Sequence, residues 1–361
     1  YYGEKFKKIK TTEKKISIEN SILNDPFEIM SLYGKKQNGL KTKKIFYQKE
    51  STNIKNILAS GEFEIKNFKH GALIQYVENQ FSNQTAKINL ILKDTIISYK
   101  ASRIKQNTLS TETIKYSDLE NLETLQIEYE NSPRATTVNQ NINSMVFYPN
   151  NGIYLSDKQF TFEGNINFIK DTALLWIEKK QILENDMPKK STLLLGPYDT
   201  NPKTLIFKEK IDISFKYDGQ QKGTGIYYYD DKLKKWIYLD TKYKNGTFYS
   251  SILSNEIFAL LSENNPPLIK NLIPDIGATY KSKDISNISF LIEDDLSGIN
   301  GIDNISIKID GDPILFEYNS YRKKITYNFE EWLTLGEHSL DIEIKDNVGN
   351  ITQRKGKFII Q

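Results

Sequence analysis

The chain of 361 residues is long enough for two or three domains. Its 49 basic and 46 acidic residues leave a net charge of only +3, which is too weak a field to attract nucleic acid, so we expect no nucleic-acid partner. The sequence holds no cysteine, which excludes disulfide bonds, thiolate metal sites and a cysteine nucleophile but is compatible with export.

The composition favours β-structure, since tyrosine (22) and phenylalanine (18) are abundant and alanine is scarce. No stretch approaches the roughly 18 apolar residues of a membrane-spanning segment, so we expect no membrane span in this chain. The chain begins with Tyr1, Tyr2 and Gly3 rather than with methionine, and we therefore expect a processed chain or a fragment of a longer one.

Residues 1–140 are expected to form a β-rich N-terminal domain, which we interpret as a β-sandwich. Its clearest strand, residues 124–129, alternates and places Leu125, Ile127 and Tyr129 on one face. Segment 132–141 is polar and lacks periodicity, so it predicts a linker to the next domain.

Residues 141–263 predict a second β-sandwich. Residues 211–217 alternate between apolar and polar side chains, which indicates a strand with one buried face. Residues 226–229 and 236–239 are β-branched or aromatic, and they flank a polar segment in the manner of a hairpin. The apolar run 257–261 predicts a buried strand that closes this domain.

The order of motifs in residues 141–263 resembles a ZU5-like β-sandwich of bacterial envelope proteins. The motifs are Asp157-x-x-Phe160-x-Phe162, Leu195-Gly196-Pro197, Ile211-x-Ile213-x-Phe215-x-Tyr217, Gly225-Ile-Tyr-Tyr-Tyr-Asp230 with Trp236, and Phe258-Ala-Leu-Leu261. The resemblance covers about a third of the chain and implies a sandwich fold without catalytic residues.

Residues 264–361 predict an Ig-like β-sandwich, because about seven short strands are separated by turn signals in under a hundred residues. Asp310-Gly311 is typical of a two-residue hairpin turn, and Gly349 fits a left-handed position in another. The unit resembles bacterial Ig-like domains in its motifs, which are Pro266-Pro267, Asp294-Asp295-x-Ser297-Gly298-Ile299, Asp310-Gly311, Leu335-Gly336-x-His338-x-Leu340 and Asp346-x-x-Gly349-Asn350.

Together, the two resemblances imply the non-catalytic C-terminal region of a large exported bacterial envelope protein, including M23-type peptidoglycan peptidases. The metal-binding histidine and aspartate motifs of those peptidases have no counterpart in this sequence. We therefore expect that the chain is not an enzyme and has no catalytic residues.

Two histidines and no cysteine are too few for the usual zinc site, and the expected positions of the two histidines do not suit a histidine-based triad. We expect His70 to lie in an exposed turn and His338 to bond locally at a corner. The carboxylate pairs Asp230/Asp231 and Glu330/Glu331 are adjacent in sequence, so on a strand their side chains would point to opposite faces and would not form an acid–base couple.

Acidic residues cluster near one end of the Ig-like unit, and Asp294, Asp295 and Asp303 are weak calcium candidates. Calcium prefers six to eight oxygen ligands from converging loops. The alternative is that these residues are ordinary turn formers, which aspartate often is. We expect no cofactor other than, at most, calcium.

The hairpin aromatics are the feature with most binding potential. Tyr228, Trp236 and Tyr238 are candidates for a binding surface, because about half of the side chains on each strand must point away from the core. The alternative is that the outward aromatics cover the sheet or the junction with the Ig-like unit.

The sequence thus predicts an all-β chain of tandem β-sandwiches that is structural or interactive rather than catalytic. We expect it outside the cytoplasm, with envelope or surface proteins or a cell-wall glycan polymer as partners, and compatible with an oligomeric assembly. The alternatives are an adhesin or carbohydrate-binding module, and an accessory C-terminal region of a cell-wall peptidase.

Overall fold

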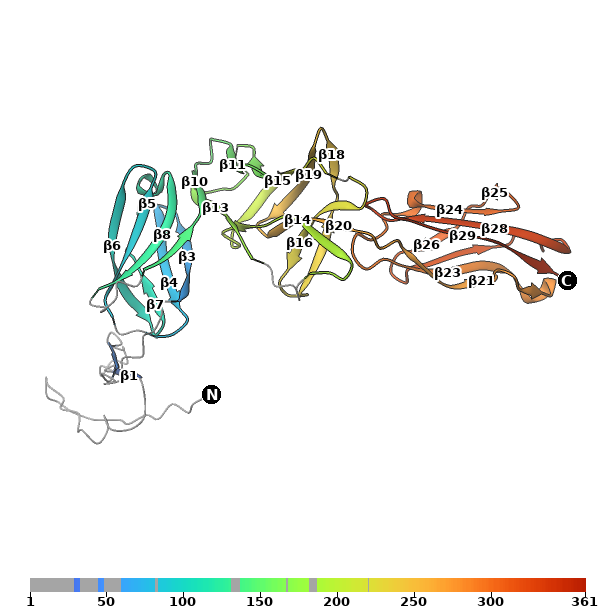
Figure 1. Cartoon of the computed structure of the whole chain (residues 1–361), viewed down its shortest axis with the longest axis horizontal. Helices are drawn as coiled ribbons and strands as arrows, with labels where there is room; N and C mark the ends of the chain where they lie inside the picture. Colours follow the sequence, from blue (N-terminus) through green and yellow to red (C-terminus); the bar gives the residue numbers. More distant parts are fainter. Residues whose placement is uncertain are drawn as a thin grey trace.

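The computed structural model of the chain describes residues 29–32, 45–48, 60–81, 84–130, 137–166, 168–181, 187–219 and 221–361. The fold is all-β, as predicted, and every sheet is antiparallel except for one short parallel pair. Figure 1 shows three groups of strands that follow one another along the long axis of the molecule. We call them the N-terminal, middle and C-terminal sandwiches. The predictions for residues 1–28, 33–44 and 49–59 lie outside the described residues.

The N-terminal sandwich contains seven strands in the spatial order β3-β4-β7-β6-β5-β8-β9. The first half of β6 pairs with β5 and its second half pairs with β7, so one long strand serves both layers. Its strands are β3 (Gly61–Phe68), β4 (Gly71–Glu78), β5 (Ala86–Leu92), β6 (Ile96–Lys105), β7 (Thr108–Ser110), β8 (Leu122–Tyr129) and β9 (Thr137–Asn141). A separate antiparallel pair is formed by β1 (Ile29–Leu32) and β2 (Ile45–Gln48).

The predicted linker at 132–141 is wrong in its second half. Residues 137–141 form strand β9, which pairs with β8 along its whole length, while residues 131–136 lie outside the described residues. Its side chains alternate between exposed and half-buried, but Val138 is the single apolar residue on the inward face, so the sequence shows little apolar alternation.

The middle sandwich packs a six-stranded sheet against a five-stranded sheet, in the orders β10-β13-β14-β20-β16-β17 and β11-β12-β15-β19-β18. The strands of the first sheet are β10 (Asn143–Phe147), β13 (Ala173–Lys179), β14 (Ser191–Asn201), β20 (Ile257–Glu263), β16 (Thr224–Asp230) and β17 (Lys235–Leu239). Those of the second sheet are β11 (Ile153–Asp157), β12 (Phe160–Gly164), β15 (Ile206–Lys216), β19 (Thr247–Ser254) and β18 (Lys242–Lys244).

Aromatic rings fill the core between these two sheets. Phe160 is fully buried and stacks on Tyr198, with ring centroids 4.7 Å apart, and it meets Phe215 at 4.9 Å. The alternation predicted for residues 211–217 is confirmed, because Ile211, Ile213 and Phe215 are buried and the residues between them are exposed or half-buried.

The C-terminal sandwich has the strand order of an immunoglobulin domain, with β21-β23-β27-β26 in one sheet and β22-β29-β28-β24-β25 in the other. The first four are β21 (Leu268–Ile273), β23 (Asn287–Glu293), β27 (Lys324–Asn328) and β26 (Glu317–Asn319). The other five are β22 (Thr279–Tyr280), β29 (Ile351–Ile360), β28 (Gly336–Lys345), β24 (Ile305–Ile309) and β25 (Asp312–Pro313).

The turn chemistry predicted for this sandwich is confirmed. Asp310 and Gly311 have φ values of 49° and 93°, as a two-residue turn with two positive φ angles requires, and Gly349 has a φ of 94°. The helical elements described are the short 3₁₀ turns η1 (Tyr116–Leu119), η3 (Ser282–Asp284) and η4 (Ile302–Asn304). Within the described part of the chain, we find no helix with the length and apolar character to cross a membrane.

Candidate functional site: the junction of the middle and C-terminal sandwiches

The six-stranded sheet of the middle sandwich is apolar on both faces. Ile226 and Leu260 pack into the core between the two sheets, while Tyr227, Trp236 and Leu261 form a second apolar cluster on the opposite face. Leu296, from the loop after β23 of the C-terminal sandwich, packs against this second cluster. The outer face is therefore the surface on which the next sandwich docks.

This arrangement corrects the predicted aromatic binding surface. The Trp236 side chain is only 4% exposed, because it lies in the second apolar cluster, so its ring offers no face to a ligand. Tyr228 is half-buried against the core of the middle sandwich. Tyr238 is half-buried, and its hydroxyl donates to the carbonyl of Asn347 in the C-terminal sandwich at 3.4 Å. The alternative, that outward aromatics cover the junction, describes Tyr238 and Trp236.

Hydrogen bonds also cross the junction. The Gly223 amide donates to the Val348 carbonyl at 2.8 Å, and the Asn350 side-chain amide donates to the Glu263 carbonyl at 3.4 Å. At Gly225, an added Cβ would lie 2.8 Å from the Tyr238 ring and 3.0 Å from the Val348 side chain. The two sandwiches thus meet by close backbone and side-chain contact.

Three carboxylates are gathered at this junction with unequal hydrogen bonding. Asp346 is 1% exposed and accepts from the Val348 and Asn350 amides and from the Asn350 side chain. Asp294 accepts from the amides of Leu296 and Gly298. Glu263 is fully buried at the end of β20; its carboxylate makes no well-formed hydrogen bond, and the neighbours that can donate to it are the Ser297 and Tyr227 hydroxyls.

Burial is the main cause that raises the pKa of Glu263, to about 7. Nearby Ser297 and Tyr227 hydroxyls act in the opposite direction, and the charges of Asp294 and Asp346 raise it further. Burial also raises the pKa of Asp294 and of Asp346, although hydrogen bonds to each carboxylate oppose the rise. The junction therefore favours neutral carboxyl groups.

A shallow groove of about 230 Å³ opens at the edge of the same junction. Tyr238, Tyr243 and Phe248 line it from the middle sandwich, and Lys345 and Asn347 line it from the C-terminal sandwich. Tyr243 is 37% exposed and packs against Phe248 with ring centroids 4.8 Å apart. The groove thus combines an accessible aromatic ring with amide, hydroxyl and ammonium groups.

The structure does not assemble the predicted calcium candidates into a site. Asp295 and Asp303 are exposed, Asp303 lies in the separate turn η4, and Asp294 is held by main-chain amides as a turn former. Among the residues that the structure describes, no group of three or more acidic, histidine or cysteine side chains is arranged to hold a metal ion.

His70 lies in the exposed turn between β3 and β4, as predicted. His338 does not lie at a corner but within strand β28, where it is 6% exposed. Its Nε2 bonds locally to the Thr334 carbonyl at 2.8 Å, but its Nδ1 bonds to Asp310, 28 residues away, at 2.7 Å. Asp230 accepts from the amides of Lys232 and Leu233, so it shapes the β16–β17 turn rather than forming a pair with Asp231.

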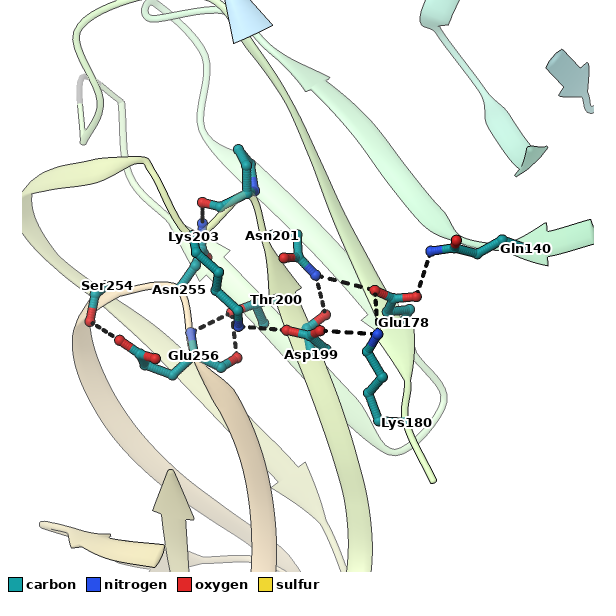
Figure 2. A network of polar contacts seen from close by, with 11 residues as sticks. Gln140, Glu178, Lys180, Asp199, Thr200, Asn201, Lys203, Ser254, Asn255 and Glu256 are labelled. Atoms are coloured by element: carbon teal, nitrogen blue, oxygen red, sulfur yellow. Dashed lines mark hydrogen bonds and ion pairs between the residues drawn. The ribbon is translucent and has the colours of Figure 1, made fainter. Parts of the chain in front are cut away.

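A second polar cluster lies at the end of the middle sandwich that faces the N-terminal sandwich. Figure 2 shows the hydrogen bonds and ion pairs that connect its side chains. Lys180 lies between Glu178 at 3.2 Å and Asp199 at 3.5 Å. Gln140, from β9 of the N-terminal sandwich, donates to Glu178 at 2.7 Å. Lys203 pairs with Asp199 at 2.5 Å. Because each charge here has a partner, this cluster acts as a structural ion-pair network.

Sequence reasoning missed Glu263 and assigned Asp346 only to a turn. A signal was present, since Glu263 ends a nearly all-apolar run just before two prolines. An acidic residue at the end of a buried strand, next to a domain boundary, is a candidate for burial between domains.

Comparisons with known proteins identify no family. No family model and no curated protein matches the chain. Among solved structures, extracellular domains 3–5 of Drosophila OTK share 10% identity, cover 81% of this chain and 92% of their own, and give a TM-score of 0.17. A bacterial ice-binding adhesin structure shares 9% identity, covers 84% and 99%, and has a TM-score of 0.18.

A third solved structure, the M60 catalytic domain with two CBM51 domains of Clostridium perfringens ZmpB, shares 9% identity. The match covers 87% of this chain and 40% of the ZmpB chain, with a TM-score of 0.19. Likenesses this low support no argument about function, and the ZU5-like and M23-related resemblances stay predictions.

Proposed function

We propose that this chain is a non-enzymatic structural and interaction module that works outside the cytoplasm, on a bacterial cell surface or in an envelope assembly. The observation that carries the proposal is the packed junction between the middle and C-terminal sandwiches. Its apolar cluster, crossing hydrogen bonds and close glycine contact hold the two bodies in one orientation.

A packed junction has a mechanical consequence. Neighbouring domains are expected to move relative to one another unless their interface is large and apolar. Here Leu296 adds an apolar contact to the cluster of Tyr227 and Trp236, and the Gly223 amide bonds across the interface. Such a chain keeps its ends apart, which is what a spacer between a cell envelope and a partner needs.

Small-angle scattering on the full chain tests this spacer role. Measured at about pH 5.5, where Glu263 is mostly neutral, the wild type should give the profile of an extended particle with a narrow range of shapes. The Leu296→Asp variant should give a broader range, because a charge placed in the apolar cluster opens the junction. The exposed Asp295→Asn variant is the matched control and should resemble the wild type. Equal profiles for wild type and Leu296→Asp would contradict the proposal.

A second candidate function, carbohydrate binding, is favoured by the groove that contains Tyr238, Tyr243 and Lys345. An accessible tyrosine ring beside polar side chains suits a sugar, which has both apolar and hydroxyl faces. A glycan array and a pulldown with isolated peptidoglycan test it. Tyr243→Ala should abolish binding, while Tyr154→Ala, at a 60% exposed tyrosine elsewhere, should leave it intact. No binding by wild type would reject this candidate.

The third alternative is an accessory C-terminal region of a cell-wall peptidase. In this alternative the chain would also be a rigid spacer, and one of the two bodies that it holds apart would be a catalytic domain. The complete reading frame decides it, since an upstream histidine and aspartate metal motif would support it and no such motif would reject it.

A further inference from the structure

Two glutamates of this chain are buried to the same extent in opposite surroundings. Glu78 is 1% exposed, but its carboxylate pairs with Arg103 at 2.6 Å and accepts from the Tyr129 hydroxyl at 2.8 Å. Glu263 is 0% exposed, and its carboxylate makes no well-formed hydrogen bond, although the Ser297 and Tyr227 hydroxyls lie near it. The first charge is paired with a cation, whereas the second faces two hydroxyls and two carboxylates.

The groups that face Glu263 come from both sandwiches. Tyr227 of β16 and Ser297 of the loop after β23 bring hydroxyls that are themselves buried without a partner. Asp294, in the same loop, and Asp346, in the β28–β29 hairpin, bring negative charge. The two charged side chains that act on Glu263 therefore both oppose its ionisation.

Basic side chains approach the junction only at its surface. Lys222 precedes the Gly223 contact and Lys345 ends β28, and the stems of both lie near Gly349 of the hairpin. Both lysines are exposed, whereas Glu263 is fully buried. The groups that shift the pKa of Glu263 are hydroxyls and carboxylates rather than a buried cation such as the one that Arg103 provides for Glu78.

The two charge states of Glu263 thus favour different arrangements of the junction. A neutral carboxyl group can remain in this dry, acidic setting and can donate or accept with the nearby hydroxyls. An ionised carboxylate without a cation is disfavoured there, because burial and the two aspartates outweigh the two hydroxyls, and separation of the sandwiches would return it to water.

We propose that the junction between the middle and C-terminal sandwiches is a proton-sensitive hinge, which stays packed while Glu263 is neutral and opens when Glu263 is ionised. Since Glu263 lies at the end of β20 and its carbonyl accepts from Asn350, its release loosens a contact between the two bodies. The inference rests on the proposed spacer role only in assuming that the junction is packed in acid.

The sign and size of the effect follow from linkage. The packed state holds its proton up to a pKa of about 7, whereas a solvated glutamate loses it near 4.5, so acid favours the packed state. The ratio of open to packed molecules should rise about 30-fold between about pH 5.5 and about pH 8.5, with most of the rise below pH 7. Asp294 and Asp346 act in the same direction, since the junction raises the pKa of each.

Pulsed electron paramagnetic resonance distances across the junction test the proposal. The chain has no cysteine, so Lys216→Cys on β15 and Lys324→Cys on β27 introduce two labels at exposed strand positions. The wild-type distance distribution should be narrow near pH 5.5 and gain a second, broader component near pH 8.5. In Glu263→Gln, which keeps the size of the side chain but cannot ionise, it should be narrow at both pH values.

Glu293→Gln is the matched control, because Glu293 pairs with Lys270 at the surface of the C-terminal sandwich. It should keep the pH dependence of the wild type. A wild-type distribution that is narrow at both pH values overturns the hinge but leaves the spacer role intact. A broad distribution at both overturns both proposals. Equal pH dependence in Glu263→Gln and in wild type also overturns the hinge.

Discussion

The same substitution at the two buried glutamates should have opposite effects on stability. Glu78→Gln removes the charge that pairs with Arg103, whose side chain is 15% exposed. Breaking a buried ion pair on one side costs about 3–5 kcal/mol. Arg103 keeps its bond to the Gln106 carbonyl at 2.8 Å and its place over the Phe81 ring, so we expect the lower end, about 3 kcal/mol.

Glu263→Gln removes a buried charge that faces two hydroxyls and two carboxylates but no paired cation, so it should stabilise the middle sandwich at alkaline pH. Because folding raises the pKa of Glu263 from 4.5 to about 7, ionisation of this group lowers the stability of the wild type by about 3 kcal/mol at pH 8. The penalty is absent below pH 4.5, grows as pH rises toward 7 and is constant above it. At pH 5 the variant should therefore differ from wild type by less than about 1 kcal/mol.

Hydrogen–deuterium exchange measures both effects locally. Peptides covering β4 should exchange faster in Glu78→Gln, and peptides covering β20 should exchange more slowly in Glu263→Gln at pH 8. Each variant is compared with wild type at the same pH, which cancels the intrinsic pH dependence of exchange. If Glu263→Gln destabilises β20 at pH 8 as Glu78→Gln destabilises β4, the contrast between a compensated and an uncompensated charge is refuted.

Three further predictions concern other sites. Phe160→Ala should cost about 3–5 kcal/mol in a urea titration of the middle sandwich, because it removes a fully buried stacked ring; a loss below about 1 kcal/mol would contradict the packing account. Partial burial alone would lower the pKa of His338, but its bonds to the Thr334 carbonyl and to Asp310 raise it above 6.5, so the stability it adds is complete below pH 6.5 and lost as pH rises through the raised value. Proton NMR should show that raised pKa and its return toward 6.5 in Asp310→Asn, and equal values in the two proteins would refute the coupling. Millimolar calcium should leave the melting temperature unchanged, because main-chain amides already occupy Asp294, and a rise that a chelator reverses would restore the calcium hypothesis.

The sequence predicts this fold well wherever one face of a strand meets a core and the other meets water. Ile211, Ile213 and Phe215 alternate with polar residues, and all three are buried as predicted. Turns that need positive φ angles are predicted equally well, since Asp310 and Gly311 adopt the positive φ values that these two residues favour.

Strand β9 escapes prediction because its inward face is only half-buried and Val138 is its single apolar residue, so pairing with β8 leaves little trace in its composition. A ladder hydrogen bond can be made by any residue other than proline, so it leaves no mark on composition. Polar, aperiodic segments between domains can thus be strands that complete a sheet.

The junction shows a different limit. Alternation along β16 and β17 separates the faces of Tyr227 and Trp236 from the core face, but it does not reveal what covers the outer face. The cover comes from Leu296, about 60 residues further along the chain, through a contact between domains. The neighbours of Glu263 in sequence mark it as a candidate for burial, but they do not show that Asp294, Ser297 and Asp346 would surround it.

The most direct test of the packed junction is the distance distribution between labels at Lys216→Cys and Lys324→Cys in the wild-type background near pH 5.5. Glu263 is mostly neutral there, so the junction should be closed. A single narrow distribution is the predicted result. A broad distribution under these conditions would show that the two sandwiches move independently, and it would contradict the account of this chain as a rigid spacer.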